Sequence, residues 1–285
     1  MEKALIVGDI HKLDTIVKVD ESLCIGCGSC IRTCPGGLIT NGDRVPVPTE
    51  NSWDLCIDCG HCVAVCPTGA VHQRFMNPEG GMPIDVQLIP TWEEARQFLA
   101  SRRSVRVYVN KPVEKEKILQ LLDVTRFAPS GANRQIVRWV VISEPAQVRR
   151  IAQMTIDWMN DVRDSNPALY KEAKLELFVK AWERGEDQIS RSAPCFIQAW
   201  APKGERTAPQ AATIGLAYAQ LAAHALGLGS SYSGGINTAA QASPALKELL
   251  GLPEGIVSFG TILLGYPAET FTMIPARKPL DVTWL

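Results

Sequence analysis

Apolar positions follow two different periods along the chain. Ala4 to Val7 and Thr15 to Val19 are short apolar or alternating runs, which predict strands. An Asn-Gly pair, Asn41-Gly42, lies between short apolar segments within Thr40 to Val47 and predicts a hairpin. From about residue 92 onward, apolar residues recur every three or four positions, which is typical of helices packed on a core.

This second part of the chain also contains strand-like segments. The periodicity predicts helices at Trp92–Leu99, Val113–Phe127, Ala146–Met159, Ala168–Arg184 and Ala208–Leu226, and strands at Arg138–Ile142, Cys195–Trp200 and Ile256–Leu264. The stretch Asn77–Pro83 is dense in proline and glycine, and Pro90 follows it, so we predict a linker there. The expected organisation is a small domain at 1–75, a linker at 76–95 and an α+β domain at 96–285, in which helices flank a central sheet.

Composition narrows the choice of function. The 285 residues carry 29 basic and 30 acidic side chains, and this balance argues against nucleic acid or an anionic membrane as the main partner. The most apolar stretch, Ile214–Gly229, is interrupted by Gln220 and His224 and is too short to cross a bilayer. The first residues do not resemble a secretory signal. We therefore expect a soluble, cytoplasmic protein.

Eight of the nine cysteines fall into two runs of the form C-x2-C-x2-C-x3-C-P. Such spacing wraps three thiolates around a 4Fe-4S cluster, while the fourth thiolate comes from the other run. The expected ligands of one cluster are Cys24, Cys27, Cys30 and Cys66, and those of a second cluster are Cys56, Cys59, Cys62 and Cys34. The first 75 residues enclose little apolar volume, so these clusters would supply much of the stability of the domain.

Other uses of these cysteines fit less well. A disulfide framework belongs to oxidising compartments and usually follows a secretory signal. Zinc sites use two C-x2-C pairs separated by a longer loop, whereas here four cysteines fall within eleven residues, twice. The ninth cysteine, Cys195, lies in an apolar strand-like segment and is predicted to be a core residue without chemistry.

A second group of polar residues lies in the larger domain. Arg102, Arg103, Ser104 and Arg106 place three guanidinium groups and a hydroxyl within five residues, a pattern that suits phosphate. Ala128–Gln135 is a polar turn whose amides can hydrogen-bond the edge of a heteroaromatic ring, and Arg277 and Lys278 add two cations. A solvated basic surface is the alternative interpretation of the arginines taken alone.

Taken in order, these segments resemble the FMN-dependent nitroreductases. The resemblance rests on R-R-S-x-R at Arg102–Arg106, A-P-S-x-x-N-x-Q at Ala128–Gln135, the glycine-serine stretch Gly229–Gly235, Gly265-Tyr266-Pro267, and Arg277-Lys278-Pro279. With the cysteine runs in front, the whole chain resembles a fusion of a bacterial-type two-cluster 4Fe-4S ferredoxin domain and a nitroreductase domain. The fold class that this implies is α+β, with a ferredoxin-like domain followed by a nitroreductase-like one.

The resemblance implies a role for each matching residue. Arg102, Arg103, Ser104 and Arg106 would contact the phosphate and ribityl chain of FMN, and Arg277 and Lys278 would close on the phosphate. Pro129, Ser130, Asn133 and Gln135 would lie along the isoalloxazine, with Ser233, Gly234 and Gly235 at its other edge. Many members continue Gln-Pro-Trp where this chain has Gln135-Ile136-Val137, which leaves the contact beyond Gln135 unassigned. The family forms homodimers with FMN at the interface, so some contacts would come from the partner chain.

The expected function is an oxidoreductase that passes electrons from an external donor, such as reduced ferredoxin or NAD(P)H, through two clusters to FMN and on to a small acceptor. Nitroaromatics, quinones and enones are all open as acceptors, and no catalytic acid or base is nominated. Flow in the opposite direction is also open. The alternative is a flavoprotein that relays electrons to a partner protein and binds no small substrate. The histidines His61, His72 and His224 and the tryptophans Trp139 and Trp200 are predicted to be structural.

Overall fold

The computed structural model describes residues 13–285, so the strand predicted at Ala4 to Val7 lies outside the described residues. The chain divides into two compact units. The first comprises the residues up to Ile89 together with 132–134, and the second comprises Pro90–Gly131 and Gln135–Leu285. The change from one unit to the other at Ile89 and Pro90 falls inside the stretch predicted as a linker.

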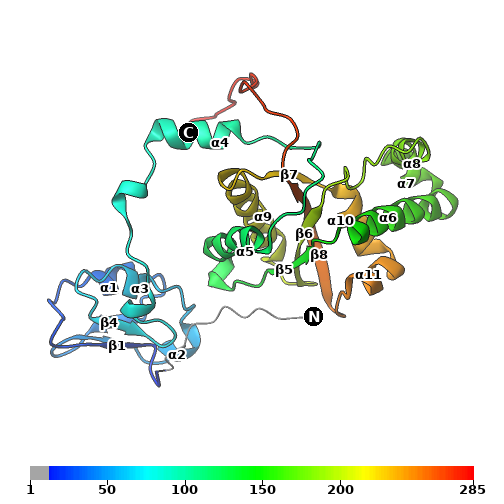
Figure 1. The fold of residues 1–285 in the computed structure, drawn as a ribbon. Coiled ribbons are helices and arrows are strands. Elements are labelled where there is room, and N and C mark those ends of the chain that lie inside the picture. Colours follow the sequence, from blue (N-terminus) through cyan, green and yellow to red (C-terminus); the bar gives the residue numbers. More distant parts are fainter. Residues whose placement is uncertain (1–12) are drawn as a thin grey trace. The chain divides into compact units, whose positions relative to one another are not determined.

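The first unit consists of short elements around the cysteines (Figure 1). Its strands are β1 (Val17–Val19), β2 (Ile39–Asn41), β3 (Pro46–Pro48) and β4 (Val71–Gln73), and its helices are α1 (Ser29–Thr33), α2 (Ser52–Leu55) and α3 (His61–Ala64). Strands β1 and β4 pair antiparallel, and β2 pairs antiparallel with β3. The β2–β3 pair is the hairpin predicted from the Asn-Gly turn, in which Gly42 N donates to Val45 O.

The core of this unit is small. It contains eight buried apolar or cysteine residues, and seven further cysteine, valine and isoleucine side chains of the two runs are among the partly buried ones packed against it. Helices α1 and α3 each begin after a glycine with a left-handed backbone, Gly28 with φ 67° and Gly60 with φ 71°. Because glycine adopts this conformation at little cost, each run turns sharply between its second and third cysteine.

Two short 3-10 turns, Pro78–Gly80 and Val86–Leu88, lie between the last cysteine run and helix α4 (Trp92–Ser101). The side chain of Asn77 accepts from Gly80 N at the start of the first turn. Thr91 and Glu94 form a reciprocal capping box at the start of α4, which explains why the helix begins there.

The second unit is built on one four-stranded antiparallel sheet in the order β5-β6-β8-β7 (Figure 1). These strands are β5 (Arg138–Ile142), β6 (Cys195–Pro202), β7 (Gly229–Tyr232) and β8 (Ile256–Gly265). The helices are α4, α5 (Lys115–Val124), α6 (Pro145–Ser165), α7 (Pro167–Glu172), α8 (Leu175–Glu183), α9 (Ala208–Ala225), α10 (Gly234–Ala242) and α11 (Pro244–Leu250), with 3-10 turns at Thr125–Phe127 and Gly131–Asn133.

Helices cover both faces of this sheet. Phe196 and Trp200 of β6 pack with α6, α8, α10 and α11 on one face, whereas Cys195, Ile197 and Ala199 pack with α5 and α9 on the other. Side chains of a strand point alternately to the two faces, so both sets of β6 residues are buried. The expected α+β fold is confirmed, and the predicted strand Arg138–Ile142 coincides with β5.

Helices α10 and α11 were not predicted, and two further differences from the predicted elements have a clear cause. The helix expected at Ala168–Arg184 is two helices, α7 and α8, because Lys174 between them has a left-handed backbone with φ 53° that no continuous helix allows. Strand β7 was not predicted as a strand: its sequence, Gly229-Ser230-Ser231-Tyr232, has a weak strand tendency, and pairing with β8 holds it in the sheet.

Candidate functional site

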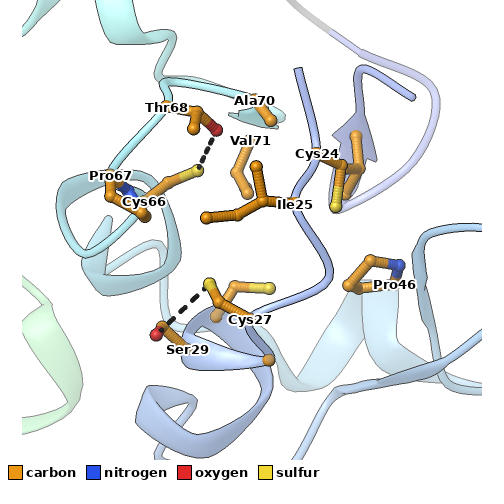
Figure 2. A pocket seen from close by; sticks show the side chains of 13 residues that line it. Cys24, Ile25, Cys27, Ser29, Pro46, Cys66, Pro67, Thr68, Ala70 and Val71 are labelled. Atoms are coloured by element: carbon orange, nitrogen blue, oxygen red, sulfur yellow. Dashed lines mark hydrogen bonds between the residues drawn. The ribbon is translucent and has the colours of Figure 1, made fainter. Parts of the chain in front are cut away.

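The first set of cysteines surrounds a pocket in the first unit. Cys24, Cys27, Cys30 and Cys66 all line it, together with mostly apolar residues that include Ile25 and Val71 (Figure 2). Three of these cysteines come from the first run and one from the second. The structure thus brings together the four residues predicted from the spacing alone.

The thiols of this set have different surroundings. Ser29 Oγ lies 3.5 Å from Cys27 Sγ, and hydrogen bonds from the side chain and backbone of Ser29 to the thiolate hold the pKa of the exposed Cys27 below its ordinary value (Figure 2). Burial raises the pKa of the Cys30 thiol, to which the charges of Cys66 and Cys24 also contribute. For Cys66, burial opposes deprotonation, but hydrogen bonds from the backbone and side chain of Thr68 bring the pKa below its ordinary value.

The second set of cysteines is also close together. Burial raises the pKa of Cys62 to about 11, and the charges of Cys59, Cys56 and Cys34 contribute in the same direction. Cys34 belongs to the first run, so the second group, like the first, contains cysteines of both runs, and their role as cluster ligands stays a prediction. Within residues 13–285, no three His, Cys, Asp or Glu side chains converge closely enough to hold a single metal ion. The thiolates of a 4Fe-4S cluster bind four different irons and are spread around a cube, so both sets fit that group.

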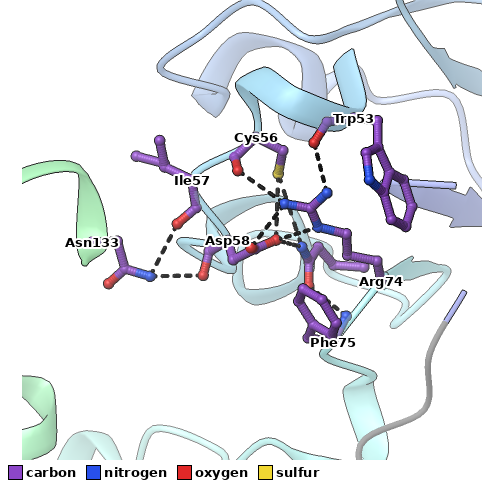
Figure 3. A network of polar contacts seen from close by, with 8 residues as sticks. Trp53, Cys56, Ile57, Asp58, Arg74, Phe75 and Asn133 are labelled. Atoms are coloured by element: carbon purple, nitrogen blue, oxygen red, sulfur yellow. Dashed lines mark hydrogen bonds and ion pairs between the residues drawn. The ribbon is translucent and has the colours of Figure 1, made fainter. Parts of the chain in front are cut away.

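A buried ion pair lies beside the second set (Figure 3). Arg74 donates through Nε to Asp58 Oδ1 at 2.7 Å and through Nη2 to Asp58 Oδ2 at 2.9 Å. Burial opposes the ionisation of Asp58, but the hydrogen bonds from Arg74 and Gln73 hold the pKa of its carboxyl below the ordinary value. Sequence reasoning did not find this pair, because its members are sixteen positions apart.

In the second unit, the arginine segment runs alongside strand β7. Ser104 forms a parallel bridge with Ser230, and Val105 N donates to Ser230 O at 3.0 Å. Gly229 allows this close approach, since a Cβ there would lie 2.6 Å from Val105 Cβ. Strand β7 leads directly into Ser233, Gly234 and Gly235. The fold thus brings the predicted phosphate segment close to the start of α10.

The arginine segment holds one unsatisfied donor. Arg102 Nη1 is buried and has no hydrogen-bond partner within residues 13–285, although a buried guanidinium donor normally has one. Arg103, Ser104 and Arg106 line a surface pocket, which Glu269 also borders. An orphaned donor beside two further cations fits a phosphate group.

The glycine-serine stretch starts helix α10. The buried side chain of Ser233 donates to Ile189 O at 3.0 Å, which holds the start of the helix against the loop before β6. Nothing lies within 4 Å of the position that a Cβ would take at Gly234, so its backbone is open to a ligand.

The polar turn predicted to lie along a flavin has an unusual backbone. Ala132, Asn133 and Gln135 have φ values of 49°, 52° and 46°, in the left-handed region that residues with a Cβ rarely adopt. Ser130, which follows Pro129, accepts from Gln135 N at 3.0 Å and closes the turn. Such strain is typical of binding sites.

The remaining two predicted contacts stand apart from this group. Arg277 and Lys278 lie in the exposed segment that follows β8, and no hydrogen bond or ion pair within the described residues joins either side chain to the arginine segment. Large apolar side chains in the same segment are also exposed, among them Phe271 at 56% and Trp284 at 91%.

The structural residues behave as expected. His224 Nε2 lies 3.0 Å from Ser101 Oγ, and its ring stacks on Phe98. Cys195 is fully buried in the sheet, and burial raises the pKa of its thiol to about 12. Trp200 is buried and Trp139 packs against the core.

Sequence reasoning missed Tyr108. Its hydroxyl donates to Val105 O at 2.7 Å and lies 3.2 Å from Ser231 Oγ, so it ties the arginine segment to β7. Burial raises the pKa of Tyr108 to about 12, even though the cations Arg106 and Arg191 lie near it. A lone tyrosine just after a basic cluster carries no motif, so only the fold could reveal it.

The two units together define a class of protein in which a cysteine-rich domain with the spacing of iron-sulfur ligands is joined to an α+β domain that has an arginine segment beside its sheet. The comparison with known families makes the assignment specific. The chain belongs to the nitroreductase family, whose model matches residues 99–266, and a 4Fe-4S dicluster domain matches residues 23–71. The predicted fusion of these two domains is therefore confirmed.

Relatives of known name match the second domain. A proposed NADH dehydrogenase/NAD(P)H nitroreductase of Archaeoglobus fulgidus is 28% identical over 178 residues, which are 62% of this chain and 87% of that protein. An FMN reductase [NAD(P)H] of Bacillus subtilis is 25% identical over 195 residues, covering 65% of this chain and 69% of that protein. The prediction of an oxidoreductase of the nitroreductase type is confirmed.

Solved structures share the fold. A nitroreductase with bound FMN from Bacteroides fragilis superposes with a TM-score of 0.54 at 20% identity, covering 67% of this chain and 98% of that one. A nitroreductase with bound FMN from Desulfitobacterium hafniense has the same TM-score at 23% identity and covers 66% and 96%. Separately, no helix within residues 13–285 has both the length and the apolar character that a bilayer crossing requires.

Proposed function

We propose that this protein is an iron-sulfur flavoprotein that carries electrons from an external donor through two 4Fe-4S clusters to FMN and on to a small acceptor. Reduced ferredoxin or NAD(P)H would serve as the donor, and a nitroaromatic, quinone or enone as the acceptor. When bound, the flavin supplies the exchange between one-electron and two-electron chemistry. The observation that carries the proposal is the grouping of the eight cysteines into two crossed sets in the same chain as an orphaned arginine donor.

The first domain supports the presence of two clusters. The space among Cys24, Cys27, Cys30 and Cys66 is bordered mainly by apolar side chains, which limit access of water to a cluster there. The first set contains both the exposed Cys27 and the buried Cys30, whereas all four thiols of the second set are half-buried. An external donor would approach the first set at Cys27.

The second domain supports FMN as the cofactor. The Arg102 Nη1 donor lacks a partner that a phosphate oxygen would supply, and Arg103, Ser104 and Arg106 would bind the phosphate and ribityl chain. Ser233, Gly234 and Gly235 would contact one edge of the ring, and Pro129, Ser130, Asn133 and Gln135 would lie along the ring. Related proteins named as FMN reductase or solved with FMN support the same cofactor.

We also propose that the protein is a homodimer with FMN at the interface. The exposed segment beyond β8 carries Arg277 and Lys278 between the exposed apolar residues Phe271 and Trp284. Apolar side chains in this number favour burial against another chain. Each copy would then bring its Arg277 and Lys278 to the site of the other, and light scattering of the purified protein would give the mass of a dimer.

Rapid mixing with reduced ferredoxin tests the electron path. In the anaerobically purified wild type, the flavin absorbance should bleach after the clusters are reduced. Changing Cys24 and Cys56 together to serine should abolish this bleaching, whereas Cys195→Ala, which removes a buried thiol outside both sets, should leave its rate unchanged. Bleaching at the wild-type rate in the double variant would refute the path.

A steady-state screen of acceptors tests the final step. Nitroaromatics, quinones and enones are offered with reduced ferredoxin or with NAD(P)H, and at least one class should be turned over. Absence of turnover with every small acceptor, together with intact flavin reduction, would instead favour a relay to a partner protein.

A further inference from the structure

The two cysteine runs differ between their first two cysteines. The first reads Cys24-Ile25-Gly26-Cys27, and the second reads Cys56-Ile57-Asp58-Cys59. Gly26 and Asp58 both have a left-handed backbone, with φ 68° and 51°. This conformation costs little for glycine and more for a residue with a Cβ. The second run therefore accepts a strain that the first run, with the same turn, avoids.

Asp58 is held by a buried cation. Arg74 is 8% exposed, donates to both carboxylate oxygens of Asp58, and donates through Nη1 to Trp53 O at 2.6 Å. Its guanidinium carbon also lies 4.6 Å from the centre of the Trp53 ring. Both charges are thus fixed in place, as Figure 3 shows.

This ion pair lies directly beside a predicted cluster ligand. Asp58 Oδ1 is 3.7 Å from Cys56 Sγ, and Arg74 Nη2 donates to Cys56 O at 3.0 Å. Gln73 directs its amide Nε2 toward Cys56 Sγ at 3.9 Å while it also donates to Asp58. Hydrogen bonds and charges close to ligand sulfurs are among the features that set the potential of a cluster.

The first run has no counterpart to this arrangement. The runs are offset by 32 positions, so Gly26 corresponds to Asp58 and Gly42 corresponds to Arg74. A Cβ at Gly42 would lie 2.5 Å from Val45 O, so no larger side chain fits there without a shift of the hairpin. The first run therefore has glycine at both positions, and the cation beside it, Arg32, donates to Cys27 O at 2.9 Å without a carboxylate partner within residues 13–285.

We propose that Asp58, Arg74 and Gln73 set the reduction potential of the cluster held by Cys34, Cys56, Cys59 and Cys62 apart from that of the other cluster. This inference rests on the proposed function. The three side chains are tuning residues and not ligands. A positive charge or a donor near the sulfur stabilises the reduced, more negative cluster and raises its potential, and a carboxylate lowers it.

The two partners of the ion pair therefore predict opposite shifts. Asp58→Asn should raise the potential of the second cluster alone, and Arg74→Gln should lower it alone. Gln73→Leu, which removes the donor to Cys56 Sγ, should also lower it. The measurement is an anaerobic redox titration of the full-length holoprotein followed by electron paramagnetic resonance, in which the first cluster serves as the control within the same molecule.

Two further variants keep the test decisive. Asp58→Gly places glycine at the position that corresponds to Gly26 of the first run. It is used instead of Asp58→Asn if the Asp58→Asn protein fails to assemble its second cluster. Gly26→Asp introduces a carboxylate without an arginine beside the first run, and should lower the potential of the first cluster only. The space around Gly26 admits this side chain, because nothing lies within 4 Å of its Cβ position.

The outcomes separate this inference from the proposed function. Fewer than about eight irons per chain in the wild type would mean that two clusters are not present, and the proposed function would fail. The inference is overturned, while the proposed function stands, if the potentials of the two clusters shift equally or not at all in these variants. It is also overturned if the second cluster shifts in the same direction in Asp58→Asn and in Arg74→Gln. Selective loss of the second cluster in both Asp58→Gly and Arg74→Gln would assign the pair to cluster assembly and would also overturn it.

Discussion

Replacing Arg102 by methionine should move the stability and the flavin affinity of this protein in opposite directions. Methionine keeps most of the length of the side chain but removes the buried Nη1 donor that has no partner within residues 13–285. A buried donor left unsatisfied costs about 1–3 kcal/mol. In flavin-free protein the variant escapes this cost, whereas in flavin-bound protein it loses a charge-assisted hydrogen bond to the phosphate.

The expected sizes follow from these two effects. Removing a cost of about 1–3 kcal/mol should raise the Tm of the flavin-free second domain by about 2 to 12 °C, given its size. Losing a hydrogen bond between a charged pair, about 1.5–3 kcal/mol, should weaken FMN binding by about 10-fold to 100-fold.

Calorimetry of flavin-free protein gives the first quantity, and fluorescence titration with FMN gives the second. Arg96→Met is the matched control, since Arg96 is exposed on helix α4, which ends just before Arg102, and it should change neither quantity. The argument is refuted if flavin-free Arg102→Met melts below the wild type while its FMN affinity is unchanged, because Nη1 would then have a structural partner.

Three other outcomes are expected. Cys34→Ser should reduce the iron content from about eight to about four per chain. It should remove the electron paramagnetic resonance signal of the cluster held by Cys56, Cys59 and Cys62, although Cys34 belongs to the first run. Loss of the signal of the other cluster would contradict the crossed ligand sets. Gly229→Ala should weaken FMN binding, because its Cβ would push Val105 and the arginine segment away from β7. Gly260→Ala is the control: its Cβ would clash with Leu216 Cδ1 in the core. This variant should lower the free energy of unfolding by about 1–3 kcal/mol but leave the FMN affinity of the folded protein unchanged. Tyr266→Phe should raise the pKa of Glu114 from about 2 toward its ordinary 4.5, because the hydrogen bond from Tyr266 is the largest cause of the depression. The stabilisation from ionised Glu114 is complete above pH 4.5 and is lost as the pH falls toward 2. NMR titration of the Glu114 carboxyl should therefore give a higher pKa in the variant. Urea unfolding at pH 5 and pH 3 should show a free energy of unfolding that depends less on pH in the variant than in the wild type.

The spacing of apolar residues in the sequence predicted the main elements of the second unit, because these helices and strands place their apolar residues against the same core. Helix α9 buries residues at helical spacing, among them Ala212, Leu216, Ala219 and Ala223, and β5 is a short run whose apolar residues Trp139 to Ile142 are all partly buried. Pattern alone was insufficient where a tertiary contact decides the backbone. Helix α8 begins after a left-handed Lys174, and β7 is a strand because β8 and Ser104 pair with it.

For the candidate site, the spacing of residues in the sequence was informative only for the cysteines, because short loops hold the cysteines of each run close together. The crossed cysteine sets follow from the C-x2-C-x2-C-x3-C-P runs, and the structure groups the same residues. Contacts between distant segments are different in kind. The contacts of Tyr108 with Ser231 and of Asp58 with Arg74 depend on how the strands pair. Single residues of these types occur throughout a globular chain, so the sequence alone does not mark them. The flavin contacts came from ordered motifs, and their geometry stays a prediction until the cofactor is bound.

The charge balance around the arginine segment explains why these motifs point to an anion. Arg44, Arg126, Arg163 and Arg184 each pair with a carboxylate at the surface. Within residues 13–285, Arg102, Arg103 and Arg106 pair with none, even though Glu269 borders the same pocket as the last two. Three cations on one short segment repel one another unless an anion offsets them. Strand pairing with β7 holds the backbone of the segment in place, and a bound phosphate would offset the repulsion among the three cations.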